Sequence, residues 1–153
     1  MATKTGKQNI VIKKIEELAK DVWNTISRLK QPELEMPIRA LSNVKYDEKE
    51  GYFKIQDRVK LRTLTASTIK TFAQSLRMMG LSKSLIEAED IATKREAYYV
   101  SKNWGDARFK EQPESDTVMD DIEAMMRVNR EQIGFIPEEK GGDVAGKLIV
   151  IDK

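Results

Sequence analysis

The stretch TASTIKTFAQSLRMMGLSKSLIEAED, residues 65–90, decides which fold the sequence predicts. Its apolar residues recur at spacings of three and four, which is typical of a helix with one buried face. Thr65 or Ser67 is placed to cap the start of this helix, and Gly80 is placed to end it after Met79. SKSLIEAED then predicts a short second helix after a tight turn. Helix, glycine turn and helix together indicate a helix-turn-helix, a shape that many helical hairpins share.

The segments around this stretch predict a mixture of α and β structure. Residues 36–64 indicate two strands around the turn DEKEG, where Gly51 suits a positive φ. A further helix is predicted over residues 115–128, with Ser115 as its cap. EEKGGDVAG followed by KLIVIDK, residues 138–153, predicts a glycine-rich turn and then a strand. We therefore expect an α+β fold, mainly α, in which helices, turn and strand assemble as a winged helix.

Residues 8–30 predict a long helix within an N-terminal arm. Apolar side chains recur along it at helical spacing, at Val11, Ile15, Leu18, Val22, Ile26 and Leu29. Pro32 and Pro37 then mark a linker. We expect residues 1–36 to form a helical arm that docks on a partner, and residues 37–153 to form the winged-helix domain. The arm must bury its apolar stripe on its own domain or on another chain, and the residues alone leave both open.

The amino-acid composition excludes several kinds of chemistry. With 153 residues, the chain is long enough for one domain, or for one domain with an attached arm. It has no cysteine and no histidine, which excludes disulfides, a cysteine nucleophile, a histidine general base and zinc sites built from these residues. A catalytic nucleophile would have to be Ser, Thr, Tyr, Lys or a carboxylate. No stretch approaches the roughly 20 apolar residues of a membrane span, and the N-terminus lacks the apolar run of a signal peptide, so we expect a cytoplasmic protein.

Charge is distributed unevenly along the chain. Residues 94–110 hold five cations and two anions, whereas residues 111–143 hold three cations and ten anions. A basic patch beside an acidic segment fits a local contact with nucleic acid better than a general coating of DNA. Chance unevenness is the alternative, and charge alone does not decide between the two.

TKREAYYVSKNW, residues 93–104, carries two adjacent tyrosines among cations. If this segment is a helix, its one apolar face is formed by Thr93, Ala97, Val100 and Trp104. Tyr98 and Tyr99 then point toward the polar side, and Arg95 lies one turn before Tyr99. A guanidinium can hold a phosphodiester while a phenol oxygen attacks the phosphorus, so the geometry favours Tyr99 over Tyr98 as a nucleophile. The alternative is an ordinary surface pair of tyrosine and cation.

Three segments resemble one known family in their order along the chain: RALSNVKYDEKEGYFKIQDRVKLRTLTASTIKTFAQSLRMM, TKREAYYVSKNW and FKEQPESDTVMDDIE. They resemble the N-terminal half of the A subunit of archaeal DNA topoisomerase VI, a type IIB enzyme whose family includes the eukaryotic meiotic double-strand-break transesterase. The resemblance implies a winged helix like that of the catabolite activator protein. It also implies that Tyr99 attacks the DNA backbone and stays linked to the 5′ phosphate, while Arg95 supports the reacting phosphate.

The same resemblance implies partners and a cofactor. In that family two A subunits form a homodimer and join two ATP-binding B subunits, on which the N-terminal arm docks. The double-strand break in duplex DNA then allows strand passage and relaxation of supercoils at the nucleoid. Mg²⁺ is held by carboxylates of a Toprim domain, which we expect to lie outside this chain. The acidic residues Glu114, Asp116, Asp120 and Asp121 are interpreted as charges near a helix start, not as a metal site.

Six basic residues are candidates for contacts with the DNA backbone: Lys60, Arg62, Lys94, Lys102, Arg108 and Lys110. Each could equally be a solvated surface charge. Two other functions remain open at this point. A non-catalytic winged-helix DNA-binding module, such as a transcription regulator, would need the fold and the basic patch but not the phenol. A pure assembly module would act through residues 8–30 and would not bind DNA.

Overall fold

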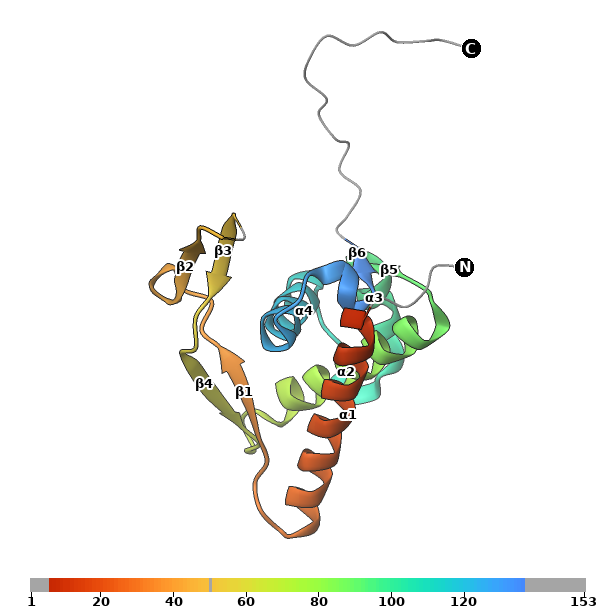
Figure 1. Cartoon of the computed structure of the whole chain (residues 1–153). Coiled ribbons are helices and arrows are strands. Elements are labelled where there is room, and N and C mark those ends of the chain that lie inside the picture. The colour runs from red at the N-terminus through yellow and green to blue at the C-terminus, as the bar shows by residue number, and fades with distance from the viewer. Residues whose placement is uncertain (1–5, 50, 137–153) are drawn as a thin grey trace, which may run out of the picture.

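A computed structural model describes residues 6–49 and 51–136 of the chain. Within those ranges the chain mixes helices with short strands, which confirms the expected α+β class. The α-helices are α1 (Gly6–Ser27), α2 (Ile69–Ala88), α3 (Lys94–Val100) and α4 (Gln112–Met126). The strands are β1 (Glu33–Pro37), β2 (Val44–Asp47), β3 (Tyr52–Ile55), β4 (Val59–Thr63), β5 (Ala92–Thr93) and β6 (Phe135–Ile136). Figure 1 shows the helices gathered in one body, with β1–β4 standing beside it as a long hairpin.

Helix α2 runs unbroken through Gly80, so the turn expected at that residue is wrong. The left-handed conformation that ends α2 is adopted at Glu89 instead, with a φ of 55°. Packing explains the difference, because Ser82 and Ile86 are buried on the turns after Gly80 and the Ser82 hydroxyl donates to the Ile133 carbonyl at 2.7 Å. These contacts outweigh the roughly 1 kcal/mol that a glycine costs inside a helix. A helix-turn-helix with its turn at Gly80 is therefore excluded.

The start of α2 also differs from the prediction. Thr68 occupies the N-cap position in place of Thr65 or Ser67, and its hydroxyl does not cap the helix. Instead the Thr68 hydroxyl donates to the Thr63 carbonyl at 2.5 Å and accepts the Thr65 backbone N–H at 2.9 Å. The threonine thus joins the end of β4 to the first turn of α2.

Helix α4 begins three residues earlier than expected. Pro113 lies in its first turn, where a proline is favoured because no N–H donor is needed there. Ser115, the predicted cap, is fully buried, and its hydroxyl has no hydrogen-bond partner among the described residues. The periodicity predicts packing through Val118, Ile122 and Met125, of which Val118 and Ile122 are buried and Met125 is partly buried.

The main core lies between α1, α2 and α4. The buried side chains of the three helices meet there with Phe109, Ile133 and Phe135, which are fully buried. Helix α1 contributes Val11 and Ile15, so this chain itself buries the first half of the predicted stripe. Because α1 joins this core, its N-terminal half does not stand apart from the other helices, while the division of the chain at residue 36 stays a prediction.

The second half of the α1 stripe is partly exposed. Val22 packs in a smaller cluster with Phe72 of α2 and the β1 residues Leu34 and Met36. Helix α1 ends at Ser27, earlier than predicted, and Leu29 lies beyond it with a φ of 56° and an exposed fraction of 97%. The helical spacing of apolar residues continues in the sequence past Ser27, but residues 28–30 are exposed in the structure.

The four strands β1–β4 confirm the β structure predicted for residues 36–64. β1 pairs with β4 and β2 pairs with β3, both antiparallel, and Gly51 has a φ of 73° in the turn. Between the two paired stretches Asn43 is buried. Its amide group donates to the carbonyls of Ile38 at 2.8 Å and Arg58 at 3.0 Å, and its oxygen accepts the Arg58 N–H at 3.2 Å. One side chain therefore replaces the missing backbone pairs where the ladder is interrupted.

A short parallel pair of strands, not expected from the sequence, fixes the start of α3. Ala92 of β5 lies opposite Phe135 of β6, and both side chains are buried. Because α3 follows β5 directly, its first residue is held against the core. The predicted glycine-rich turn and strand at residues 138–153 lie outside the described residues, so the winged helix stays a prediction.

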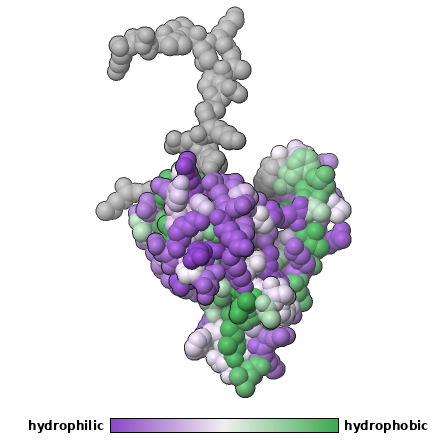
Figure 2. All heavy atoms as spheres, turned by 180° about the vertical axis from the view of Figure 1, so that it is seen from behind, coloured by the Kyte–Doolittle hydropathy of each residue, from purple (hydrophilic) through white to green (hydrophobic). Residues whose placement is uncertain are grey.

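Exposed apolar side chains are prominent at two places on the surface. Figure 2 shows them on the β2–β3 part of the hairpin and at the end of the molecule where α1 ends. Phe53 represents the first place, with 71% of its side chain exposed, and Trp23 the second, with 70% exposed. Between residues 6 and 136, leaving aside residue 50, every helix is too short or too polar to cross a membrane.

Candidate active site

The site is built on α3, a helix of seven residues. Thr93 and Glu96 form a capping box, in which the Thr93 hydroxyl accepts the Glu96 N–H at 3.1 Å and the Glu96 carboxylate accepts the Thr93 N–H at 2.6 Å. Ala97 and Ser101 are fully buried, whereas Val100 is exposed. The buried face of α3 therefore runs through Ala97 and Ser101, and the prediction that Val100 belongs to it is wrong.

Tyr99 and Arg95 lie side by side on the exposed face of α3, as their spacing predicts. The phenol of Tyr99 is 54% exposed. The Arg95 Nη2 donates to the Tyr99 hydroxyl oxygen at 3.4 Å, and the guanidinium carbon lies 5.7 Å from the centre of the Tyr99 ring. A cation and a phenol oxygen thus lie together on the exposed face of α3, a combination that suits the binding of an anion.

Tyr98 does not point toward the polar side as predicted. Its ring packs against the main core, and its hydroxyl donates to the Lys110 carbonyl at 3.0 Å. The ammonium of Lys102 donates to the same hydroxyl at 2.7 Å and lies 3.9 Å from the centre of the Tyr98 ring. The two adjacent phenols therefore have different environments: the Tyr98 hydroxyl is bound by a carbonyl and an ammonium of the chain, whereas the Tyr99 hydroxyl accepts from the Arg95 guanidinium on a more exposed residue.

The six predicted DNA contacts also fall into two groups. Lys94 lies 3.5 Å from the Asp116 carboxylate, and Arg62 lies 2.8 Å from the Asp121 carboxylate. Lys102 donates to the Tyr98 hydroxyl, as described above. The other three have exposed side chains: Lys60, Arg108 and Lys110. Whether any of the six contacts DNA stays a prediction.

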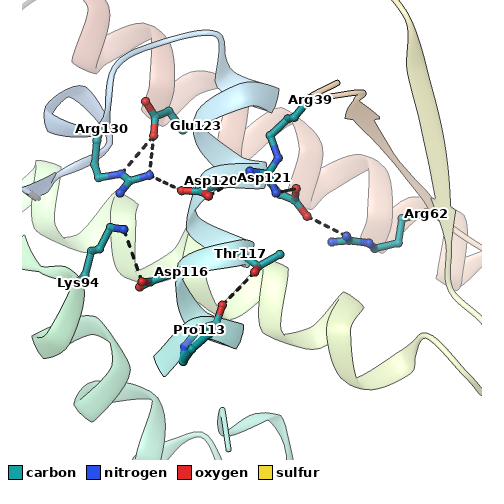
Figure 3. A network of polar contacts seen from close by, with 10 residues as sticks. All are labelled: Arg39, Arg62, Lys94, Pro113, Asp116, Thr117, Asp120, Asp121, Glu123 and Arg130. Atoms are coloured by element: carbon teal, nitrogen blue, oxygen red, sulfur yellow. Dashed lines mark hydrogen bonds and ion pairs between the residues drawn. The ribbon is translucent and has the colours of Figure 1, made fainter. Parts of the chain in front are cut away.

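A network of charges on α4 joins this helix to the hairpin and to the segment after it. Figure 3 shows three carboxylates of α4 between three arginines. The distances are 3.0 Å for Arg39 to Asp120, 3.1 Å for Arg39 to Asp121, and 2.8 Å for Arg62 to Asp121. Arg130 binds Asp120 and also Glu123, the latter at 2.9 Å.

This network was not predicted from the sequence, although a signal for it exists. Residues 111–126 contain six acidic residues and no basic one, so their cations had to come from other segments. The partners Arg39 and Arg130 lie far from these acids or beyond the end of α4, and only the fold brings them together. Of the acids interpreted as charges near a helix start, Glu114 does lie in the first turn of α4, whereas Asp120 and Asp121 bind arginines that attach the hairpin to α4.

Comparison with known proteins identifies the family. The A subunit of type 2 DNA topoisomerase 6 from Methanocaldococcus jannaschii is 47% identical to this chain over 146 residues, which is 95% of the chain. The model of the family described as Type IIB DNA topoisomerase matches residues 70–135. That range includes α3 with both tyrosines. The chain belongs to the type IIB DNA topoisomerase family.

The similarity covers only part of these type IIB relatives. The chain spans 40% of the length of the Methanocaldococcus jannaschii protein. The proteins of the same name in Methanothermobacter thermautotrophicus and Archaeoglobus fulgidus are 33% and 32% identical, over 95% and 87% of this chain and over 41% and 37% of their own lengths. The activity and partners of a whole topoisomerase are therefore matters for proposal.

The Mg²⁺ that the resemblance to type IIB topoisomerases implies has no fitting site in the described part of the chain. Residues 6–49 and 51–136 contain no group of three acidic side chains arranged to hold a metal ion. Asp120 and Asp121 face arginines, and Asp116 faces Lys94. These carboxylates are neutralised by cations of the same chain, so a metal would have to displace those cations.

Proposed function

We propose that this chain is the DNA-cleavage domain of a type IIB topoisomerase A subunit, and that Tyr99 is its nucleophile. One observation carries the proposal: of the two adjacent tyrosines, Tyr99 is the more exposed, and its hydroxyl lies beside a guanidinium. Tyr98 has its hydroxyl bound to a carbonyl and an ammonium of the chain. The winged-helix architecture remains part of this proposal, with its helix-turn-helix formed elsewhere than at Gly80.

The reaction is a transesterification. The Tyr99 phenol oxygen forms a bond to a phosphorus of the DNA backbone as the bond from that phosphorus to the 3′ oxygen breaks. The phenol loses its proton, and the departing 3′ oxygen gains one, so that the products are a 5′-phosphotyrosyl bond and a free 3′ hydroxyl. No water is consumed, and attack by the 3′ hydroxyl reverses the step. Arg95 binds the oxygens of the reacting phosphate, where charge increases in the transition state.

Assembly follows the family named above. Two such chains, each within an A subunit, would cut the two strands of one duplex, which requires a homodimer of A subunits. Two B subunits would bind and hydrolyse ATP, giving an A₂B₂ complex that passes a second duplex and relaxes supercoils. Mg²⁺ would come from a Toprim domain outside this chain. The exposed apolar residues at the end of α1, Trp23, Ile26 and Leu29, are the surface that this arm would offer to the B subunit.

The DNA backbone would cross the exposed face of α3 and the loop that follows it. Lys110 and Arg108, in that loop, have exposed side chains and would contact phosphates, as would Lys60 on the hairpin. Arg62 and Lys94 already face carboxylates, so we expect weaker contributions from them. Phosphate contacts of this kind position the duplex without reading its sequence.

Trapping the covalent adduct tests the nucleophile. The A subunit containing this region is mixed with the B subunit, ATP and supercoiled DNA, denatured, and examined for protein linked to 5′ ends. Wild type, Tyr98→Phe and Tyr99→Phe are compared, with Tyr46→Phe on the hairpin as a matched control. We expect every protein except Tyr99→Phe to form the adduct. An adduct that survives in Tyr99→Phe would refute the assignment.

The same experiment separates the rival functions. A non-catalytic DNA-binding module would bind DNA equally well with or without the Tyr99 hydroxyl, and no variant, wild type included, would become linked to DNA. A pure assembly module would show negligible DNA affinity at any salt concentration, yet lose its partner when residues 1–36 are deleted. A wild-type protein that binds DNA without forming an adduct would leave the DNA-binding module as the better interpretation.

A further inference from the structure

We infer that Tyr98 and Lys102 are positioning residues that hold the neighbouring Tyr99 in the orientation needed for attack. The inference rests on the proposed function and assigns roles to two residues that the proposal leaves without one. We call the set formed by Tyr98, Lys102 and the carbonyls of Phe109 and Lys110 the tyrosine lock. It reassigns Lys102, which the sequence predicts to be a DNA contact.

The Tyr98 side of the lock joins α3 to the start of the loop before α4. Its ring lies against the main core, and its hydroxyl donates to the Lys110 carbonyl at 3.0 Å. The carbonyl of Tyr98 in turn accepts the hydroxyl of the buried Ser101 at 2.5 Å. Both ends of this residue are therefore fixed, and the side chain cannot turn without breaking a hydrogen bond.

The Lys102 side of the lock uses all three donors of an ammonium group. The Lys102 Nζ donates to the Tyr98 hydroxyl at 2.7 Å, to the Phe109 carbonyl at 2.8 Å and, more weakly, to the Lys110 carbonyl at 3.5 Å. An ammonium that binds two carbonyls and a phenol of its own chain is poorly placed to bind a phosphate. These contacts favour a structural use of the charge.

The segment between α3 and α4 needs such a fastening because regular structure is scarce there. After Val100 the chain makes two short 3₁₀ turns, Ser101–Asn103 and Gly105–Ala107, before it reaches the buried Phe109. Short 3₁₀ turns supply few backbone hydrogen bonds. The lock adds hydrogen bonds from side chains, and it ties this segment to the last turn of α3.

Tyr99 depends on the lock because its own side chain is lightly held. Its ring meets the Tyr98 ring at a centre-to-centre distance of 5.6 Å with a tilt of 50°, and its hydroxyl accepts from Arg95. More than half of the Tyr99 side chain faces solvent. If Tyr98 shifts, the ring against which Tyr99 packs shifts with it. A displacement of about 1 Å in a reacting group can cost on the order of 100-fold in rate.

The test measures single-turnover adduct formation and DNA affinity in the complete complex of A and B subunits. Tyr98→Phe keeps the ring and removes the hydroxyl, and Lys102→Met keeps the length and removes the charge. Tyr46→Phe and Lys20→Met, both at exposed positions outside the site, are the matched controls. We expect both lock variants to form the Tyr99 adduct about 10- to 100-fold more slowly at saturating DNA, since positioning affects the rate and not the binding.

The salt dependence of DNA affinity provides the readout that separates positioning from binding. A lysine that contacts a phosphate contributes about one unit to the slope of log affinity against log salt, so the lock predicts an unchanged slope for Lys102→Met. Amide hydrogen exchange should be faster over residues 101–110 in both variants and unchanged in α2, which shows that they remain folded. The double variant should be no slower than the slower single one, because both changes open the same lock.

Each outcome has one meaning. Slow adduct formation with an unchanged salt slope supports the lock. A reduced slope and normal rate at saturating DNA in Lys102→Met would instead make Lys102 a DNA contact and overturn the inference. Rates equal to those of the two controls would overturn it as well, with the proposed function intact. Absence of an adduct in the wild type would refute the proposed function, and the lock with it.

Discussion

Two carboxylates of α4, Asp120 and Asp121, and one cation of α3, Arg95, are used in opposite ways. On α4, Asp120 and Asp121 are enclosed by Arg39, Arg62 and Arg130, so most of the charge is cancelled within the chain. On α3, Lys94 pairs with Asp116 of α4, whereas Arg95 lies next to the Tyr99 phenol on the exposed face of the helix. Both regions belong to the segment that matches the family model.

The difference shows why the number of charges alone does not locate a functional surface. An acidic helix that is neutralised by arginines from three segments stabilises an arrangement, here the attachment of the hairpin to α4. A guanidinium that shares an exposed face with a phenol instead brings a positive charge next to a hydroxyl at the surface. The comparison predicts that changes on α3 should affect chemistry, whereas changes on α4 should affect stability.

The largest effect is expected when the α3 cation is removed. Arg95→Gln should lower the rate of adduct formation by about 100- to 1,000-fold, the size of effect seen when a donor to the transition state is lost. Its melting temperature should stay close to that of wild type, because the Arg95 side chain is exposed. Arg77→Gln on the exposed part of α2 is the control. An Arg95→Gln protein with a wild-type rate would remove the basis for treating α3 as the catalytic region.

A smaller effect, and one on stability, is expected on α4. Asp121→Asn leaves Arg39 and Arg62 without their shared carboxylate, and we expect it to lower the free energy of unfolding by about 2–4 kcal/mol, the lower end allowing for the exposure of Arg39. Urea unfolding followed by circular dichroism measures the change, with Asp106→Asn as an exposed control. A stable Asp121→Asn protein that forms no adduct would contradict the comparison, because a change on α4 would then affect chemistry and not stability.

The predicted DNA contacts give a finer test of the same distinction. Lys110→Gln removes an exposed cation beside the site and should reduce the salt slope of DNA affinity by about one unit. Arg62→Gln removes a cation already bound to Asp121, so it should lower stability and leave the slope nearly unchanged. Titration of labelled duplex at several salt concentrations measures both slopes. Equal losses of slope would mean that DNA displaces Arg62 from its carboxylate.

The smallest effect concerns the two ion pairs of Lys83, at the joint between α1 and α2. Hydrogen bonds from Lys83 to Glu87 and then to Glu16 raise the Lys83 pKa above its usual 10.5. The resulting stabilisation is fully present below 10.5 and is lost as the pH rises through the raised pKa. Lys83→Met should therefore melt slightly below wild type at neutral pH and level with it at strongly alkaline pH, whereas Lys20→Met should match wild type throughout. If the melting temperature of Lys83→Met lies below that of wild type by the same amount at both pH values, the effect comes from packing and not from the charge.

Local patterns predicted much of the fold, and tertiary contacts decided the rest. The strands around Gly51 and the buried positions Val118 and Ile122 of α4 follow from periodicity and turn chemistry alone. The break expected at Gly80 does not occur, because the buried contacts of Ser82 and Ile86 continue the helix past it. Such contacts come from residues near 133, which no local pattern in residues 65–90 reveals.

In the candidate site, too, local patterns predicted some features and tertiary contacts decided the others. The spacing of Arg95 and Tyr99 on one helix face is a local property, and the structure has it as predicted. The environment of Tyr98 is not local, because its hydroxyl partner is the carbonyl of Lys110, twelve residues away. A helical wheel places both tyrosines on the polar side, and only the path of the loop back to α3 separates them.

Identification of the residue that carries the DNA tests the central claim most directly. The adduct formed by the wild-type complex of A and B subunits is digested with nuclease and protease, and the peptide that covers residues 93–104 is sequenced by fragmentation in a mass spectrometer. The fragments between Tyr98 and Tyr99 locate the nucleotide on one of the two phenols. We predict that the nucleotide is attached to Tyr99 alone, and a nucleotide on Tyr98 or on any other residue would contradict the account.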